Sequence, residues 1–114
     1  MSQHITIART GRRVRVVLAG VTIAESDAAL SLKEGGSGPV LYIPRADARW
    51  EHFSKTARSS HCPHKGDASY YTLTVGDVSR TDAVWSYEDP FPAVGEIKDH
   101  LAFYPDKVDA IELG

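Results

Sequence analysis

The segment from His61 to Lys65 brings together the side chains of this chain with the most reactive chemistry. The order His61-Cys62-Pro63-His64-Lys65 places a thiol beside two imidazoles and an ammonium group. A neighbouring lysine can favour the thiolate form of a cysteine, and a histidine can act as its base. One hypothesis is therefore an enzyme, a hydrolase or a transferase. Its catalytic group would be Cys62 as a nucleophile or Lys65 as an amine whose pKa is lowered by burial.

The same segment also has a plain structural interpretation. Cys62 is the single cysteine of the chain, which excludes an internal disulfide, dithiol exchange within one chain and a zinc site of four cysteines. Pro63 has no backbone N–H, so the residue after the thiol cannot donate to an oxyanion. Because free cysteines are often buried as small apolar groups, a buried Cys62 is the alternative to a nucleophilic one.

A metal site in this segment would use His61, Cys62 and His64, with His52 or His100 from elsewhere in the chain. Zinc prefers three or four ligands in tetrahedral geometry, and adjacent residues such as His61 and Cys62 seldom bind one ion together. We therefore expect solvated histidines in a turn, with no metal and no cofactor.

Aromatic side chains concentrate in the second half of the chain. Trp85 and Tyr87 are two positions apart, so both side chains leave the same face of a strand. Tyr70 can join them from a neighbouring strand, since cross-strand aromatic pairs are favourable. These rings are either core residues or the walls of a pocket for a small planar ligand, with a lysine and a carboxylate to orient it.

Basic residues gather around residues 44–53, a segment for which we predict a short helix: Arg45, Arg49, Lys55, Arg58 and Lys65. Arginine binds phosphate through two parallel hydrogen bonds, which makes Arg45 a candidate ligand contact. Asp47, Glu51 and Asp67 are interspersed, and this mixture favours a solvated face of mixed charge.

Most of the chain alternates apolar and polar residues with the period of a β-strand. The alternating segments are residues 4–9, 13–18, 21–24, 40–43, 69–75, 82–87 and 108–113, with a further short strand around Leu30 and Leu32. A polar stretch, 54–60, leads into a turn over 61–67. Strands this closely spaced indicate an antiparallel all-β domain or a β-rich α+β domain.

Two segments predict short helices. Pro44 suits a first helical turn, and Ala46, Trp50 and Phe53 follow at helical spacing, which predicts a helix over 44–53. Residues 94–101 predict one helical turn or two. The glycine run 35–38 is followed by Pro39 and a strand rather than a helix, so we interpret it as a flexible loop and not a phosphate-binding loop.

Composition describes an ordinary globular domain. The chain has 114 residues, a formal net charge of -2 and 42% hydrophobic residues, which fits a single domain over 1–114. A sequence pI of about 6.2 argues against a nucleic-acid binder. No segment is apolar for the roughly 20 residues that a membrane helix needs, and no secretory signal is visible. We expect a cytoplasmic protein, a monomer or a small homo-oligomer, with a bacterial source suiting so compact a chain.

Four motifs together resemble a known family. They are Tyr42-x-Pro44, Cys62-Pro63-x-Lys65-Gly66-x-Ala68-x-Tyr70, Ala83-x-Trp85-x-Tyr87-x-x-Pro90 and Ala102-Phe103-Tyr104. Over about Val14 to Leu113 the chain is similar to the bacterial and fungal "domain of unknown function 427". Glu34, Tyr42 and Asp47 also fall where that family usually has these residues.

The resemblance implies a mainly β fold, the β-tent of the Mss-four-like group, in which two antiparallel sheets meet at an angle. That group looks like the drug-binding domain of cereblon, the Yippee proteins and some zinc-carrying chaperone-like domains. In those relatives zinc is held by four cysteines, and an aromatic cage between the sheets binds a small ligand or peptide group. The single cysteine of this chain departs from the zinc pattern, whereas the aromatic residues are kept.

The family also carries a nucleotidyltransferase label. That chemistry needs paired carboxylates, a short way past a Gly-Ser turn, to hold magnesium. Here the Gly36-Ser37 turn is followed by Asp47-Ala48-Arg49, with an arginine where a second carboxylate would stand.

Our first hypothesis is a module that binds an unidentified small molecule, and neither nucleic acid nor a membrane, in a cleft between two sheets. Its candidate ligand contacts are Glu34, Tyr42, Arg45, Lys65, Tyr70, Trp85 and Tyr87. The alternatives are an enzyme that uses Cys62 or Lys65 in the same cleft and a domain that binds a protein partner.

Overall fold

The fold was analysed in a computed structural model that describes residues 4–36 and 38–114; Ser37, in the predicted flexible loop and the Gly36-Ser37 turn, and residues 1–3 lie outside the described part. The strands are β1 (Ile5–Arg9), β2 (Val14–Leu18), β3 (Val21–Ser26), β4 (Leu30–Glu34), β5 (Val40–Pro44), β6 (Phe53–Cys62), β7 (Gly66–Val75), β8 (Val78–Ser86), β9 (His100–Phe103) and β10 (Ala110–Leu113). The short 3₁₀ helices are η1 (Arg45–Asp47), η2 (Trp50–His52), η3 (Pro92–Ile97) and η4 (Pro105–Lys107). The described chain is therefore mainly β, as predicted.

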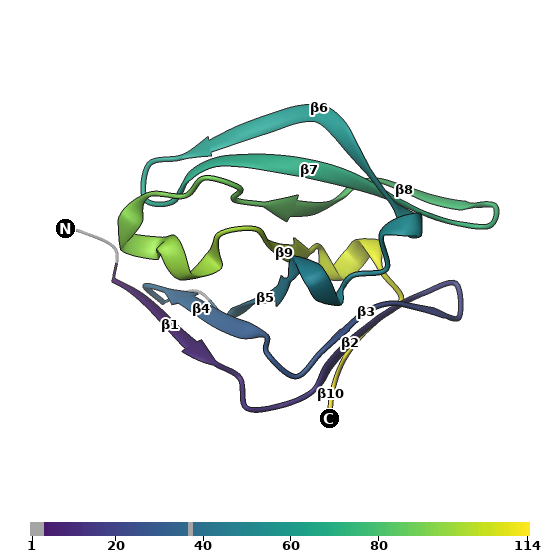
Figure 1. Cartoon of the computed structure of the whole chain (residues 1–114), viewed down its shortest axis with the longest axis horizontal. Helices are drawn as coiled ribbons and strands as arrows, with labels where there is room; N and C mark the ends of the chain where they lie inside the picture. The colour runs from purple at the N-terminus through teal and green to yellow at the C-terminus, as the bar shows by residue number, and fades with distance from the viewer. Residues whose placement is uncertain (1–3, 37) are drawn as a thin grey trace.

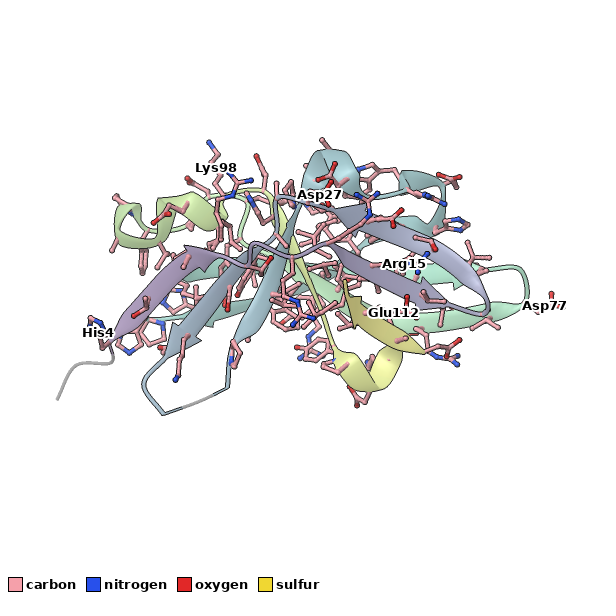
Figure 2. All side chains as sticks on the ribbon, turned by 90° about the horizontal axis from the view of Figure 1, so that it is seen from below. His4, Arg15, Asp27, Asp77, Lys98 and Glu112 are labelled. Carbon is pink, nitrogen blue, oxygen red and sulfur yellow. The ribbon has the colours of Figure 1, made fainter. Side chains whose placement is uncertain are left out.

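The strands form two antiparallel sheets (Figure 1). The larger has seven strands in the order β1-β4-β5-β9-β8-β7-β6, and the smaller has three in the order β10-β2-β3. Along β2, Val14, Val16 and Leu18 are fully buried while Arg15 is exposed, which confirms the predicted alternation. Arg15 lies on the outer face of the small sheet, 2.9 Å from Glu112 of β10 (Figure 2).

The main core lies between the two sheets. Val16 and Ile23 of the small sheet pack in one cluster with Ile43, Tyr71 and Leu101 of the large sheet. A second cluster lies on the other face of the large sheet, where it packs with η3. Its buried members are Leu32, Tyr42, Ala68, Tyr70, Tyr87, Val94, Ile97 and Ala102. Neighbouring residues of one strand, such as Tyr70 and Tyr71, therefore enter different clusters.

The large sheet consists of two halves that meet at the contact of β5 with β9. These two strands pair through Ile43–Leu101 and Pro44–His100. Among the described residues they form no further pairs toward Val40 and Phe103, although β9 goes on pairing with β8 as far as Phe103. The half β1-β4-β5 and the half β9-β8-β7-β6 thus separate beyond this contact.

The helix predicted over 44–53 is wrong. The segment contains two separate 3₁₀ turns, η1 and η2, with Ala48 and Arg49 extended between them. Ala48 forms a β-bridge with Ala24, and the N–H of Arg49 donates to the carbonyl of Ile23 at 2.8 Å. These tertiary hydrogen bonds take the place of helical ones.

Three further predictions differ from the structure. The turn predicted over 61–67 is confined to residues 63–65, because β6 extends to Cys62 and β7 begins at Gly66. The polar stretch 54–60 is part of β6, an edge strand that pairs with β7 from Phe53–Leu73 to Cys62–Gly66. Because most of its side chains are exposed, its sequence does not alternate between apolar and polar residues. The helical segment predicted over 94–101 ends at Ile97, and His100 already belongs to β9. In the described part of the chain, no helix is long and apolar enough to cross a membrane.

Candidate functional site

A cleft of about 310 Å³ opens beside the second core cluster. Six of the predicted ligand contacts line it: Glu34, Tyr42, Lys65, Tyr70, Trp85 and Tyr87. All of these residues come from the large sheet or its connecting loops. The cleft therefore lies between the two halves of one sheet, and not between the two hydrogen-bonded sheets as predicted.

The polar end of the cleft is an ion pair between Lys65 and Glu34. Lys65 sits in the turn between β6 and β7, where its N–H donates to the carbonyl of Cys62 at 3.2 Å. This turn brings the ammonium Nζ to 2.7 Å from Oε1 of Glu34, at the end of β4. The residue Lys65 is 9% exposed, so the pair is largely removed from water.

The pKa of Lys65 is raised above its ordinary value. Burial alone would lower it, but the hydrogen bond from Nζ to Glu34, helped by the nearby Cys62 and Tyr42, outweighs that effect. The expected lowering of the Lys65 pKa is therefore wrong. A raised pKa favours the protonated ammonium form of Lys65. This form donates hydrogen bonds and has no free electron pair with which to act as a nucleophile.

Trp85 is the central wall of the cleft and is held on two sides. Its indole Nε1–H donates to the Tyr42 hydroxyl at 3.3 Å, and the two rings meet edge to face with centroids 6.4 Å apart. Tyr104 packs on the indole with ring centroids 4.6 Å apart. Tyr70 lies opposite Trp85 in the register of β7 and β8, so the cross-strand neighbour expected from the sequence is confirmed.

Tyr70 and Tyr87 line the cleft in different ways. The Tyr70 hydroxyl lies 2.7 Å from Oγ of Ser60, and the guanidinium of Arg58 lies 4.7 Å from the Tyr70 ring centroid. Tyr87 follows β8 and is 6% exposed. Burial, and secondarily the nearby Tyr42, raises the pKa of Tyr87. The phenol is therefore neutral at physiological pH and able to donate a hydrogen bond.

Four further residues line the cleft that were not predicted from the sequence: Leu32, Gly38, Val40 and Tyr104. Tyr104 could have been predicted as a lining residue, because it is the last residue of the motif Ala102-Phe103-Tyr104. Leu32 and Val40 are apolar residues of β4 and β5 that no local pattern distinguishes from ordinary core residues.

The comparison with known families agrees with these motifs. A family model described as "Domain of unknown function (DUF427)" matches residues 6–114. The chain belongs to the DUF427 family. No curated protein matches this DUF427 chain.

Arg45 is the predicted ligand contact that this DUF427 protein places elsewhere. It starts η1, just beyond β5, and its guanidinium lies 4.4 Å from the ring centroid of Trp50. One of its nitrogens donates to the Tyr71 hydroxyl at 3.3 Å. Because Tyr71 faces the opposite side of β7 from Tyr70, Arg45 is directed away from the cleft.

Arg45 belongs instead to a polar cluster around Glu88. The carboxylate of Glu88 accepts hydrogen bonds from Lys55 Nζ at 2.8 Å, Ser69 Oγ at 3.0 Å and Tyr71 Oη at 2.6 Å. Burial would raise the pKa of Glu88, but these donors outweigh it and lower the pKa to about 2. The cluster ties β6 and β7 to the loop after β8.

Cys62 packs half-buried against the second core cluster, beside the cleft but outside its lining. Its neighbour His61 lies 2.7 Å from Asp67, so this imidazole is engaged across the hairpin. The catalytic role of Cys62 stays a prediction.

The family model carries the short name NTP_transf_9. Asp47, the carboxylate considered for magnesium, accepts a hydrogen bond from Oγ of Ser26 at 2.6 Å. Within residues 4–36 and 38–114, no three His, Cys, Asp or Glu side chains are grouped so that they could hold a metal ion.

Proposed function

We propose that this DUF427 protein binds a small, flat, uncharged molecule with a polar edge in the cleft of Trp85, Tyr42, Tyr70, Tyr87 and Tyr104. The observation that carries the proposal is the combination of these aromatic walls with the Lys65–Glu34 pair at one end. Small-molecule sites are typically apolar hollows with a few polar groups that fix the orientation of the ligand.

The Lys65–Glu34 pair supports a neutral ligand rather than a charged one. Its ammonium and carboxylate lie 2.7 Å apart, so their charges offset each other within the cleft. Together they present N–H donors beside carboxylate acceptors, and the Tyr87 hydroxyl adds a further donor. A planar compound with neighbouring C=O and N–H groups, such as an amide, an imide or a pyrimidine base, matches this arrangement.

Trp85 supports a binding role because it is partly exposed and yet immobilised. A half-buried indole leaves apolar surface open to water, and its contacts with Tyr42 and Tyr104 hold the ring in one orientation. A rigid aromatic wall loses little conformational entropy when a ligand stacks on it.

A thermal-shift screen of the purified protein tests the proposal. The panel holds cyclic imides, uracil and related planar compounds, amino-acid derivatives, nucleotides and divalent metals. A compound at 100 times its dissociation constant stabilises the fold by about 2.7 kcal/mol, which raises the melting temperature of a domain of this size by several degrees. We expect planar uncharged compounds to produce such shifts.

Two tryptophan variants provide the control. Trp85→Leu removes a wall of the cleft, whereas Trp50→Leu removes an indole that packs on Arg45 and Tyr71. The shift should disappear in the first variant and persist in the second. Shifts retained by Trp85→Leu, or no shift with any planar compound, would reject the cleft as a small-molecule site. A shift that needs both a nucleotide and magnesium would favour nucleotidyl transfer instead.

A further inference from the structure

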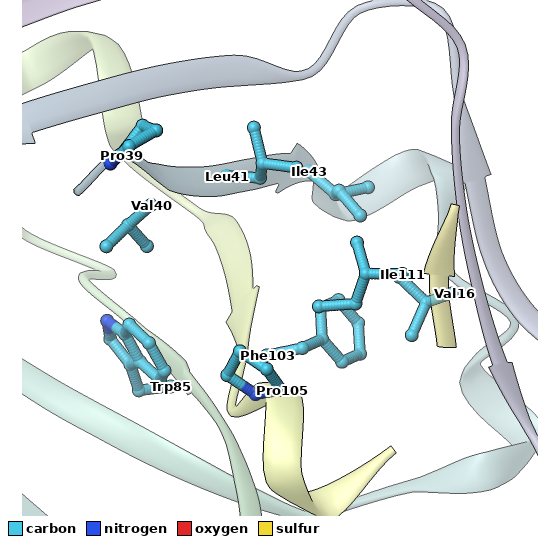
Figure 3. A pocket seen from close by; sticks show the side chains of 9 residues that line it. All are labelled: Val16, Pro39, Val40, Leu41, Ile43, Trp85, Phe103, Pro105 and Ile111. Carbon is cyan, nitrogen blue, oxygen red and sulfur yellow. The ribbon is translucent and has the colours of Figure 1, made fainter. Parts of the chain in front are cut away.

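A second hollow of about 200 Å³ lies between the two sheets, next to the cleft (Figure 3). Its walls are apolar side chains from β2, β5, β9 and β10, among them Val16, Leu41, Phe103 and Ile111. Figure 3 shows Val40 and Trp85 at one end of this cavity and Val16 and Ile111 at the other. None of the residues that form its described lining carries a charge.

The cavity and the cleft share two walls, Val40 and Trp85. They meet where the large sheet is split, because β5 and β9 pair at Ile43–Leu101 but not at the positions nearer Val40 and Phe103 among the described residues. Consecutive residues of the chain also line the two hollows at their edges. Gly38 lines the cleft and Pro39 the cavity, and on the opposite side Tyr104 lines the cleft and Pro105 the cavity.

The two hollows differ in chemistry. The cleft contains the Lys65–Glu34 pair and tyrosine hydroxyls, whereas the cavity is lined by aliphatic and aromatic carbon. We infer that they are two compartments of one binding site, which takes an amphiphilic ligand with a flat polar head and a short hydrocarbon tail. The head occupies the cleft, and the tail crosses between Val40 and Trp85 into the inter-sheet cavity. This inference rests on the proposed function of the cleft and names the class of its ligand.

The size of the cavity limits the tail. An engineered apolar cavity of about 150 Å³ in another protein accepts benzene, so about 200 Å³ suits a phenyl ring or a chain of four to six carbons. Each methylene transferred from water into such a cavity contributes about 0.8 kcal/mol, which is roughly a fourfold gain in affinity.

The test compares three probes by chemical-shift titration of the ¹⁵N-labelled protein. Benzamide represents the head, 4-butylbenzamide represents head and tail together, and toluene represents the tail. We expect 4-butylbenzamide to bind at least tenfold more tightly than benzamide. It should shift amide signals in both compartments, whereas benzamide should shift those around the cleft.

Two substitutions assign the gain to its compartment. Ile111→Phe fills the cavity from the terminal strand β10 and should abolish the advantage of the butyl tail without weakening benzamide. Glu34→Gln alters the polar end of the cleft and should weaken both amides while leaving toluene binding intact. Leu41→Phe fills the same cavity from β5 and replaces Ile111→Phe if that variant does not fold.

The outcomes separate this inference from the proposed function. Benzamide binding with no gain from the tail, or a gain that survives cavity filling, would overturn the two-compartment site while leaving the cleft proposal standing. If neither amide binds, the two-compartment site is overturned, while the cleft proposal is decided by the thermal-shift screen of the other planar compounds. Toluene binding alone would then mark the cavity as an isolated apolar hollow.

Discussion

At the scale of single residues, two charged side chains of this protein are held by specific hydrogen bonds on opposite sides of the large sheet. Lys65 is paired with Glu34, and Glu88 accepts three hydrogen bonds on the opposite side of the sheet. The two groups respond oppositely to their surroundings: the pKa of the ammonium is raised and that of the carboxylate is lowered to about 2. In both cases the ionised form is favoured.

Glu88 makes the stability of the fold depend on acid. A carboxylate whose folded-state pKa is lowered stabilises the protein above its ordinary pKa of 4.5, and this contribution is lost as the pH falls toward about 2. We expect Glu88→Gln to lower the free energy of unfolding at pH 7 by about 2 kcal/mol. The difference from the wild type should shrink toward zero between pH 4.5 and 2, when urea unfolding is followed at each pH. A constant difference across that range would contradict the assigned pKa.

At the scale of elements, the hairpin of β6 and β7 positions the polar end of the cleft. Its turn contains Lys65, and the carbonyl of Lys65 accepts a hydrogen bond from the N–H of Phe91 at 2.9 Å. Gly66 follows with a φ of +112°, and a Cβ there would lie 3.5 Å from the carbonyl oxygen of Asp89. The backbone conformation of this glycine therefore sets the position of the lysine beside it.

Replacing this glycine should cost both stability and binding. Gly66→Ala forces an L residue into a conformation suited to glycine, so we expect a loss of roughly 1–3 kcal/mol in unfolding free energy. It should also weaken the binding of any compound that hydrogen-bonds to Lys65. Gly76→Ala is the matched control, because Gly76 has a φ of +56° in the turn between β7 and β8 with open space around it. Equal losses in the two variants, measured by urea unfolding, would argue against a special role for Gly66.

At the scale of the whole molecule, one of the β5–β9 pairs that join the two halves of the large sheet also belongs to the core shared with the small sheet. Ile43 of β5 pairs with Leu101 of β9, and both side chains belong to the core cluster shared with β2 and β3. The packing of the small sheet and the joining of the two halves therefore depend on the same residues, so we expect the domain to unfold as one unit.

Leu101 tests this dependence. Leu101→Ala should lower the unfolding free energy by about 2–5 kcal/mol, because the side chain is fully buried and leaves a cavity. Leu113→Ala makes the same chemical change in a residue that is 45% exposed, and its cost should stay below about 1 kcal/mol. Tryptophan fluorescence and far-ultraviolet circular dichroism should report one coincident urea transition in each protein. Separate transitions for the two probes would show that the halves unfold independently.

The sequence alone determined the positions of strands that have one buried face. Val14, Val16 and Leu18 alternate with exposed or half-buried neighbours. In β7 and β8 the alternation is interrupted by pairs of adjacent buried residues, Tyr70–Tyr71 and Ala83–Val84. The sequence did not reveal β6, because an edge strand with mostly exposed side chains has no buried face to impose the alternation. The local spacing over 44–53 indicated a helix, but the hydrogen bonds of Ala48 and Arg49 with β3 come from residues far away in the chain.

The chemical character of the cleft was also readable from the sequence, since Trp85, Tyr87, Tyr70 and Lys65 stand in recognisable motifs. Which of these residues meet was decided by the tertiary structure. The order β5-β9-β8-β7 sets Tyr42 against Trp85 and brings Tyr104 onto the same indole. It also directs Arg45 to Glu88 on the other side of the sheet. Side-chain type and spacing are local properties, whereas strand order and the split between β5 and β9 depend on how the whole chain buries its apolar surface.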